Sequence, residues 1–173
     1  QFFRHLLWLF GIDYYSRETL CEHPKVISLY QTFYGCKSLT SIPENLFANN
    51  PEVTEFIGTF RNCSTLKSIP ENLFANNPKV IDFGSTFSAC SALKSIPAGL
   101  FDNNRMVTTF SCTFYGCSAL TVKSYTMIGD KKVHLYERGN YPDHFTEPTD
   151  FRVCFYDSTD MRDYIQAPDD WKE

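Results

Sequence analysis

The hydrophobic and polar positions along the chain repeat with a period of 27 residues. Copies 53–79 and 80–106 are identical at 15 of 27 positions, and 26–52 has the same pattern. Each copy has a first half, V-x-x-(L/F)-x-x-T-F-x-x-C, and a second half, L-x-S-I-P-x-x-L-F-x-N-N. A fixed period of this length is typical of a solenoid, in which each unit covers its neighbour's apolar face. We therefore expect equivalent side chains to form continuous rows.

The two halves predict different local structures. In the second half, Leu66 to Ile69 is typical of a short parallel strand, which Pro70 ends because proline has no amide hydrogen to donate. One helical turn is expected through Leu73 and Phe74, and the paired asparagines predict a turn. The T-F-x-x-C piece of the first half predicts another short helical turn, with Phe and Cys pointing inward. Rows of Thr and Asn are expected to hydrogen-bond the buried backbone.

The pattern changes towards both ends of the chain. Residues 1–25 keep apolar residues at the repeat spacing, which indicates a degenerate unit covering the N-terminal end. The alternative is an amphipathic helix, and a membrane-surface helix is a weaker version of it. After a partial repeat, residues 123–150 form an insertion. In it, Tyr125–Ile128 and Lys132–Tyr136 flank Gly129-Asp130 as in a β-hairpin, and 138–149 is expected to be loop.

The repeat returns after the insertion. Phe155 falls at the place of Phe114, Ser158 falls at the cysteine position, and an acidic C-terminal cap follows. The predicted fold is an α/β repeat solenoid, a right-handed leucine-rich-repeat-like coil of short parallel strands and short helical turns. Its single domain comprises an N-terminal cap (1–25), full repeats (26–52, 53–79, 80–106), a partial repeat (107–122), the hairpin insertion (123–150) and a degenerate terminal repeat (151–173).

Composition and charge exclude several classes of protein. The net charge is −4 and the 16 Lys and Arg residues are scattered, so no basic stripe supports nucleic-acid binding. The 16 Phe residues recur at fixed positions and are explained as stacked core. The longest apolar run, Leu6 to Phe10, is too short for a transmembrane segment. The N-terminus shows neither an initiating Met nor a signal-peptide pattern, which indicates a segment or processed form of a longer product.

The pieces L-x-x-I-P-x-x-L-F and F-x-x-C-x-x-L resemble the BspA-like, Treponema-type leucine-rich repeats. The resemblance covers roughly residues 26–122, and the period of 27 is longer than is usual in that family. Proteins of this family are mostly bacterial, often from gut or oral anaerobes, and many are exported to the cell surface. The resemblance therefore implies a parallel-β solenoid, export, and binding or adhesion to other macromolecules.

The residue types that often serve in catalysis or metal binding have structural explanations in this sequence. Four cysteines share one repeat position and are expected to form a row of buried thiols: Cys36, Cys63, Cys90 and Cys117. One such residue per coil does not predict a tetrahedral metal site. The four histidines are scattered over the ends and the insertion, and the adjacency of Asp143 and His144 in sequence does not by itself predict a shared geometry, so no catalytic set is predicted. The acidic tail does not match a calcium-binding loop. We expect no cofactor, no metal and no enzymatic activity.

The informative positions are those that vary between otherwise matching repeats, because packing fixes the constant ones. Three rows vary and are expected to be exposed, starting at Ser28, Tyr30 and Tyr34. The candidate binding face comprises Tyr30, Tyr34, Ile57, Arg61 and Tyr115, since Tyr and Arg are favoured at interfaces; neutral variation on a solvated face is an equal alternative. The insertion is the other candidate. The predicted function is a surface or secreted protein that binds a protein or glycan through this face. The alternative is a spacer or assembly module within a longer array.

Overall fold

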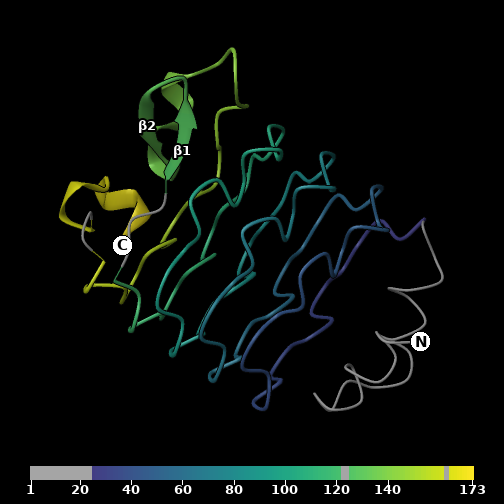
Figure 1. Ribbon diagram of the computed structural model, residues 1–173. Helices are drawn as coiled ribbons and strands as arrows, with labels where there is room; N and C mark the ends of the chain where they lie inside the picture. Colours follow the sequence, from purple (N-terminus) through teal and green to yellow (C-terminus); the bar gives the residue numbers. More distant parts are fainter. Residues whose placement is uncertain (1–24, 122–124, 162–163) are drawn as a thin grey trace.

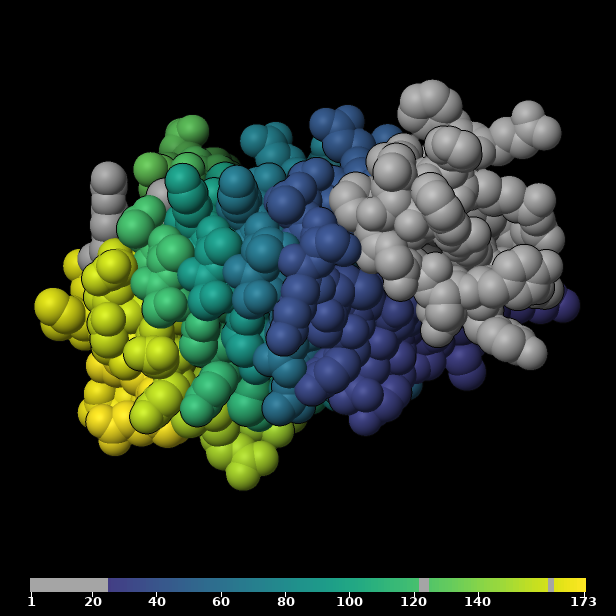
Figure 2. Space-filling model, turned by 90° about the horizontal axis from the view of Figure 1, so that it is seen from below, coloured from purple at the N-terminus to yellow at the C-terminus, as the bar shows by residue number. Residues whose placement is uncertain are grey.

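The computed structural model of the protein describes residues 25–121, 125–161 and 164–173. The predicted N-terminal cap lies outside the described residues, apart from Lys25. In Figure 1, consecutive repeats lie side by side, from the N-terminal end of the described chain to the yellow C-terminal segment. Figure 2 shows the repeats from below as neighbouring bands whose order follows the sequence.

Backbone hydrogen bonds join each repeat to the next through their first halves. The N–H groups of residues 56, 58, 60 and 62 donate to the carbonyl groups of residues 82, 84, 86 and 88 at 2.8–2.9 Å. The same offset of 26 residues joins the neighbouring pairs of repeats. Isolated parallel bridges mark this row: Ser28–Glu55, Glu55–Asp82, Asp82–Thr109 and Thr109–Asp150. The repeats therefore form a stack held together by a ladder that runs across all of them.

The first half does not contain the predicted helical turn. The N–H groups of residues 59, 61 and 63 donate to carbonyl groups three residues back, at 3.0–3.2 Å, while those between them donate to the next repeat. Gly58 and Asn62 adopt φ of +61° and +63°. A left-handed residue every four positions redirects alternate N–H groups out of the turn, so a continuous helix cannot form. Hydrogen-bonded turns replace the helix.

The strand predicted at Leu66 to Ile69 is also wrong. Among the described residues, a single bridge, Ser41–Ser68, joins the second halves, and the Lys67 N–H donates to the Thr40 carbonyl at 3.1 Å. The regular parallel ladder lies in the first half instead. Turns also replace the predicted helical turn through Leu73, whose N–H donates to the Pro70 carbonyl at 3.3 Å. The only paired strands in the described residues belong to the insertion.

The interior is filled by rows of phenylalanine, as the period predicts. Phe60 is 1% exposed and stacks on Phe33 and Phe87, with ring centroids 5.1 and 5.5 Å apart. Phenylalanines of the second half pack at an angle against those of the first. The Phe74 ring lies 4.7 Å from Phe56 at 58°. Such offset and tilted arrangements add to the stabilisation from burial, because they match the positive ring edges with the negative ring faces.

Polar rows satisfy the buried carbonyl groups between repeats, which confirms the expected ladders. The Thr86 hydroxyl donates to the Phe56 and Phe83 carbonyls at 2.9 and 2.6 Å. The Cys90 thiol donates to the Phe60 carbonyl at 3.2 Å. In the last repeat Ser158 takes over the thiol's role and donates to Phe114 at 3.0 Å. Side-chain donors thus follow the 27-residue period where the backbone has no regular partner.

The insertion forms the predicted hairpin, with different bounds. Strands β1 (Tyr125–Ile128) and β2 (Lys131–His134) pair antiparallel, and the hairpin projects from the end of the stack (Figure 1). The second strand begins one residue earlier and ends two residues earlier than predicted. The 3₁₀ helix η1 (Leu135–Asn140) occupies the end of the predicted strand and the start of the predicted loop. It begins there because the Glu137 carboxylate accepts the His134 N–H at 2.8 Å.

The C-terminal segment covers the last repeat. It contains the 3₁₀ helices η2 (Tyr164–Gln166) and η3 (Asp169–Trp171). The carbonyl groups of Asp170 and Trp171 accept the N–H groups of Val153 and Phe155 at 3.2 and 2.8 Å. The Trp171 ring stacks on Phe151 at 4.9 Å. This segment therefore continues the inter-repeat ladder by one partial layer while its acidic side chains face solvent.

Candidate binding face

The exposed aromatic side chains of the first halves form the candidate face. Tyr30, Tyr34 and Tyr115 are 59%, 48% and 38% exposed, large fractions for aromatic side chains. The intervening positions carry the inward-pointing Phe and Thr rows, so the ladder presents these tyrosines outward. Arg61 is exposed and Ile57 is half-buried. Four of the five candidates are therefore exposed as predicted, whereas Ile57 is partly covered.

The stack places the candidates in two rows. The first row occupies equivalent positions of successive repeats: Tyr34, Arg61, Ser88 and Tyr115. The residue after each of the first three donates its backbone N–H to the carbonyl group of the next member of the row. Ser88 is 5% exposed and interrupts the row between Arg61 and Tyr115. Tyr30 and Ile57 start the second row. The structure therefore brings Tyr34 and Arg61 onto adjacent repeats and places Tyr115 two repeats beyond Arg61.

Tyr156 continues the first row and was not among the predicted residues. Its ring stacks on Tyr115, with centroids 4.9 Å apart and planes at 9°, and it is 45% exposed. The signal was present in the sequence. Phe155 follows Phe114 by 41 residues, and the same offset places Tyr156 after Tyr115. We call Tyr30, Tyr34, Ile57, Arg61, Tyr115 and Tyr156 the tyrosine face.

Tyr34 is held in place by the neighbouring repeat. The Asn62 side-chain amide donates to the Tyr34 hydroxyl oxygen at 2.9 Å. The Tyr34 hydroxyl keeps its own hydrogen and a further lone pair for another partner. Tyr34 and the Tyr115–Tyr156 pair are thus exposed rings with fixed orientations.

Carboxylates lie along the bridge row beside the tyrosines. Burial raises the pKa of Asp82, the Gly84 N–H opposes this by donating at 2.6 Å, and the negative charges of Glu55 and Asp150 raise it further. The Arg152 guanidinium pairs with Asp150 at 3.0 Å and lowers the pKa of that carboxyl. The face can therefore offer aromatic surface, hydroxyls, carboxylates and the Arg61 guanidinium.

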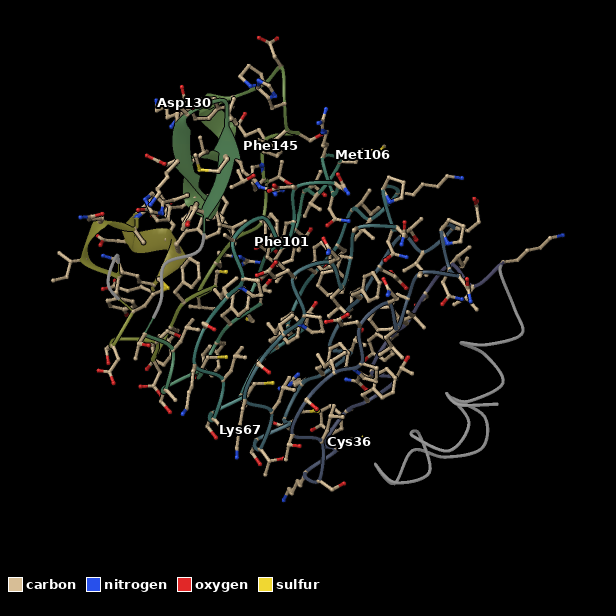
Figure 3. All side chains as sticks on the ribbon, viewed as in Figure 1. Cys36, Lys67, Phe101, Met106, Asp130 and Phe145 are labelled. Carbon is tan, nitrogen blue, oxygen red and sulfur yellow. The ribbon has the colours of Figure 1, made fainter. Side chains whose placement is uncertain are left out.

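The buried thiols are poor candidates for nucleophiles. Burial raises the pKa of Cys90 to about 12 and raises the pKa of Cys117 and Cys154 as well. For Cys63 the largest cause of the raised pKa is a hydrogen bond with Cys36. Because the thiolate is the reactive form, these side chains are inert at neutral pH. In Figure 3, Cys36 and Lys67 lie at the edge of the stack opposite Met106.

The described part of the chain shows no cluster of three or more His, Cys, Asp or Glu side chains arranged to hold a metal ion. Across those same residues, no helix is long and apolar enough to cross a membrane.

Comparison with known proteins finds structural similarity to leucine-rich repeat proteins. No protein-family model matches the chain. No curated protein matches it. A leucine-rich repeat protein from Bacteroides ovatus is similar over 56% of this chain and 34% of that chain, with 24% identity and a TM-score of 0.28. The T. pallidum leucine-rich repeat protein is similar over 56% of this chain and 61% of that chain, with 19% identity and a TM-score of 0.22.

The aligned region spans less than two thirds of either neighbour's length. The fold is therefore defined by contacts within this chain. These contacts are the backbone hydrogen bonds between residues 26 positions apart and the stacked phenylalanine rows.

Proposed function

We propose that this chain is a non-enzymatic binding module of an exported or cell-surface protein, and that its tyrosine face contacts a protein or glycan. In this proposal the stacked repeats are the coils of a right-handed leucine-rich-repeat solenoid of the BspA-like type. The resemblance of the repeat motif to that family supports both the fold assignment and the export. The tyrosine face supports the binding role.

The observation that carries the proposal is the Tyr115–Tyr156 pair. Two adjacent tyrosines stack 4.9 Å apart, yet they remain 38% and 45% exposed. Aromatic side chains that are held rigidly and left in water lose little conformational entropy when a partner covers them. Tyrosine and arginine are also enriched among the residues that dominate interface energies. A rigid row with Tyr34, Arg61 and this pair can therefore make several contacts with one extended partner.

Binding without catalysis fits the chemistry of the described residues. The raised pKa values of the buried thiols keep them protonated, and the tyrosine face contributes hydroxyls beside the carboxylates of the bridge row. General acid–base catalysis needs a group that titrates near the working pH within reach of a nucleophile. Glu55 and Asp82 serve instead as hydrogen-bond acceptors for a bound partner.

The test is a binding screen of the full chain against arrays of glycans and extracellular-matrix proteins. A variant with Tyr34, Arg61 and Tyr115 changed to Ser is measured in parallel. The matched control changes Glu44, Lys67 and Lys94 to Ser, three exposed residues of the second halves. We expect a saturable hit that the first variant weakens at least tenfold and the control leaves unchanged.

Two outcomes would overturn this proposal. If a hit survives in the face variant, binding lies elsewhere on the chain, and the insertion becomes the next candidate. If a folded sample binds nothing on either array, the spacer or assembly function is favoured.

A further inference from the structure

A cleft lies between the insertion and the C-terminal segment, and no residue of the tyrosine face lines it. Its volume is about 300 Å³, and its walls come from η1, from residues 147–151 and from η3. Its lining includes the aromatic rings of Tyr136, Phe151 and Trp171 and the carboxylates of Glu147 and Asp170; we call it the terminal cleft. Its volume is at the lower end of the range for ligand sites, which suits a single side chain rather than a polymer.

The aromatic wall of the terminal cleft is rigid. His134 stacks on Tyr136, with centroids 5.2 Å apart and planes at 6°. Trp171 stacks on Phe151 at 4.9 Å and 4°, and the Trp171 ring lies edge-on to Tyr136 at 6.4 Å and 71°. One face of Tyr136 and one of Phe151 are therefore covered. What the wall offers is an apolar surface suited to a narrow aliphatic stem rather than an open platform for a flat sugar ring.

The two carboxylates of the terminal cleft lack a cation. Within residues 25–121, 125–161 and 164–173, neither Glu147 nor Asp170 takes part in an ion pair. Gly139 makes room for the Glu147 side chain, because a Cβ at 139 would lie 3.3 Å from the Glu147 Cγ. The whole chain carries a net charge of −4. The cleft is thus an acidic, aromatic-walled recess in an acidic protein.

We propose that the terminal cleft binds a lysine side chain presented by a partner protein. The aliphatic stem lies along the aromatic wall, and the ammonium group donates hydrogen bonds to Glu147 and Asp170. Carboxylates complement the ammonium charge, and aromatic rings near a cation add attraction through their negative faces. This site uses none of the residues of the tyrosine face and does not depend on the function proposed for it.

The probe is a short acetylated and amidated peptide, Gly-Lys-Gly, compared with the same peptide carrying norleucine in place of lysine. Norleucine keeps the aliphatic stem and removes the charge. Binding is followed by the NMR signal of the Trp171 indole N–H, which a Trp8→Phe variant distinguishes from the second tryptophan of the chain. We expect the lysine peptide to shift this signal saturably and the norleucine peptide to bind at least tenfold more weakly.

Paired variants localise the site. Glu147→Gln with Asp170→Asn removes both charges while preserving side-chain shape, and we expect at least a tenfold loss of lysine-peptide affinity. Asp143→Asn with Asp160→Asn removes the same charge from exposed residues that do not line the cleft, and it should bind as the unmodified chain does. The variant with Tyr34, Arg61 and Tyr115 changed to Ser should also retain lysine binding.

Three results would overturn the proposal: no saturable shift with the lysine peptide, equal binding of the norleucine peptide, or full binding by the Glu147→Gln, Asp170→Asn variant. None of them bears on the tyrosine face, whose own test uses other residues.

Discussion

Arg138 takes the place of an asparagine one repeat after Asn104. In the preceding repeats, Asn77 and Asn104 form a ladder by donating to carbonyl groups of the repeat before them. The Asn104 amide donates to the carbonyl groups of Phe74 and Asn77 at 3.2 and 2.8 Å. The Arg138 guanidinium donates to the equivalent carbonyl groups one repeat on, those of Phe101 and Asn104, at 2.7 and 3.2 Å. In Figure 3, Phe101 lies in the stack below the hairpin. A side chain of the insertion therefore closes a ladder that the next repeat would otherwise continue.

Replacing Arg138 with Met should destabilise the chain by about 3 kcal/mol, because two buried carbonyl groups would each lose a donor at about 1–3 kcal/mol. Arg138 is 2% exposed, and its guanidinium also lies 4.2 Å from the centre of the Phe145 ring. Urea unfolding followed by circular dichroism measures the change. The control Arg105→Met, at an exposed position, should stay within about 0.5 kcal/mol. Equal stability of both variants would show that Arg138 is not a cap.

Replacing Phe60 with Ala should cost about 3–5 kcal/mol of unfolding free energy, since a buried ring is removed and a cavity remains. The ring contacts equivalent rings on both sides, so two interfaces between repeats lose packing at once. A denaturant titration gives the value. Tyr30→Ala serves as the control on an exposed ring, with an expected change below about 1 kcal/mol. A change near zero for Phe60→Ala would contradict the stacked core.

At a residue with left-handed backbone, a substitution by glycine is expected to raise the free energy of unfolding. Ser85 has φ of +55° at the place where another repeat carries Gly58. Glycine removes a steric penalty of about 1–2 kcal/mol there and costs about 0.5–1 kcal/mol of chain entropy. Ser85→Gly should therefore stabilise the chain by about 0.5–1 kcal/mol, measured as a shift of the urea midpoint. Ser118→Gly, outside the left-handed positions, should destabilise it instead. Destabilisation by both would argue against the backbone assigned to this row.

The sequence predicted the rows far better than the backbone between them. A 27-residue period fixes which side chains share a row, so the stacked phenylalanines and the serine that replaces a thiol at Ser158 follow from spacing alone. The sequence predicts a helical turn where hydrogen-bonded turns occur, because only some of the left-handed positions carry residues that favour this conformation. Gly58 and Asn62 are residues that favour this conformation, whereas Ala89 and Val153 adopt it without any such signal.

The candidate site was predictable to the same extent and for the same reason. Rows of varying residues pointed to Tyr34, Arg61 and Tyr115 because exposed positions escape the packing constraint. Tyr156 needed the 41-residue offset across the insertion. The fit of Arg138 into the asparagine ladder depends on a contact between residues 34 positions apart that no period encodes. The walls of the terminal cleft likewise come from segments joined only by folding.

The buried thiol row should make stability fall at alkaline pH. Burial raises the pKa of Cys90 to about 12 in the folded chain, above the ordinary value of 9.0. The folded state therefore keeps this proton when the unfolded state has released it. The stability of the folded state that comes from keeping the Cys90 thiol protonated is fully present below pH 9 and is lost as the pH rises towards 12. Each such thiol can contribute up to about 1.4 kcal/mol per pH unit in that window.

Urea titrations under reducing conditions should therefore show a shallower decline between pH 9 and 11 for Cys90→Ala than for the unmodified chain. Cys112→Ala, which replaces a half-buried thiol outside the row, is the control and should decline as the unmodified chain does. Identical slopes for all three proteins would mean that Cys90 ionises as readily in the folded state as in the unfolded one.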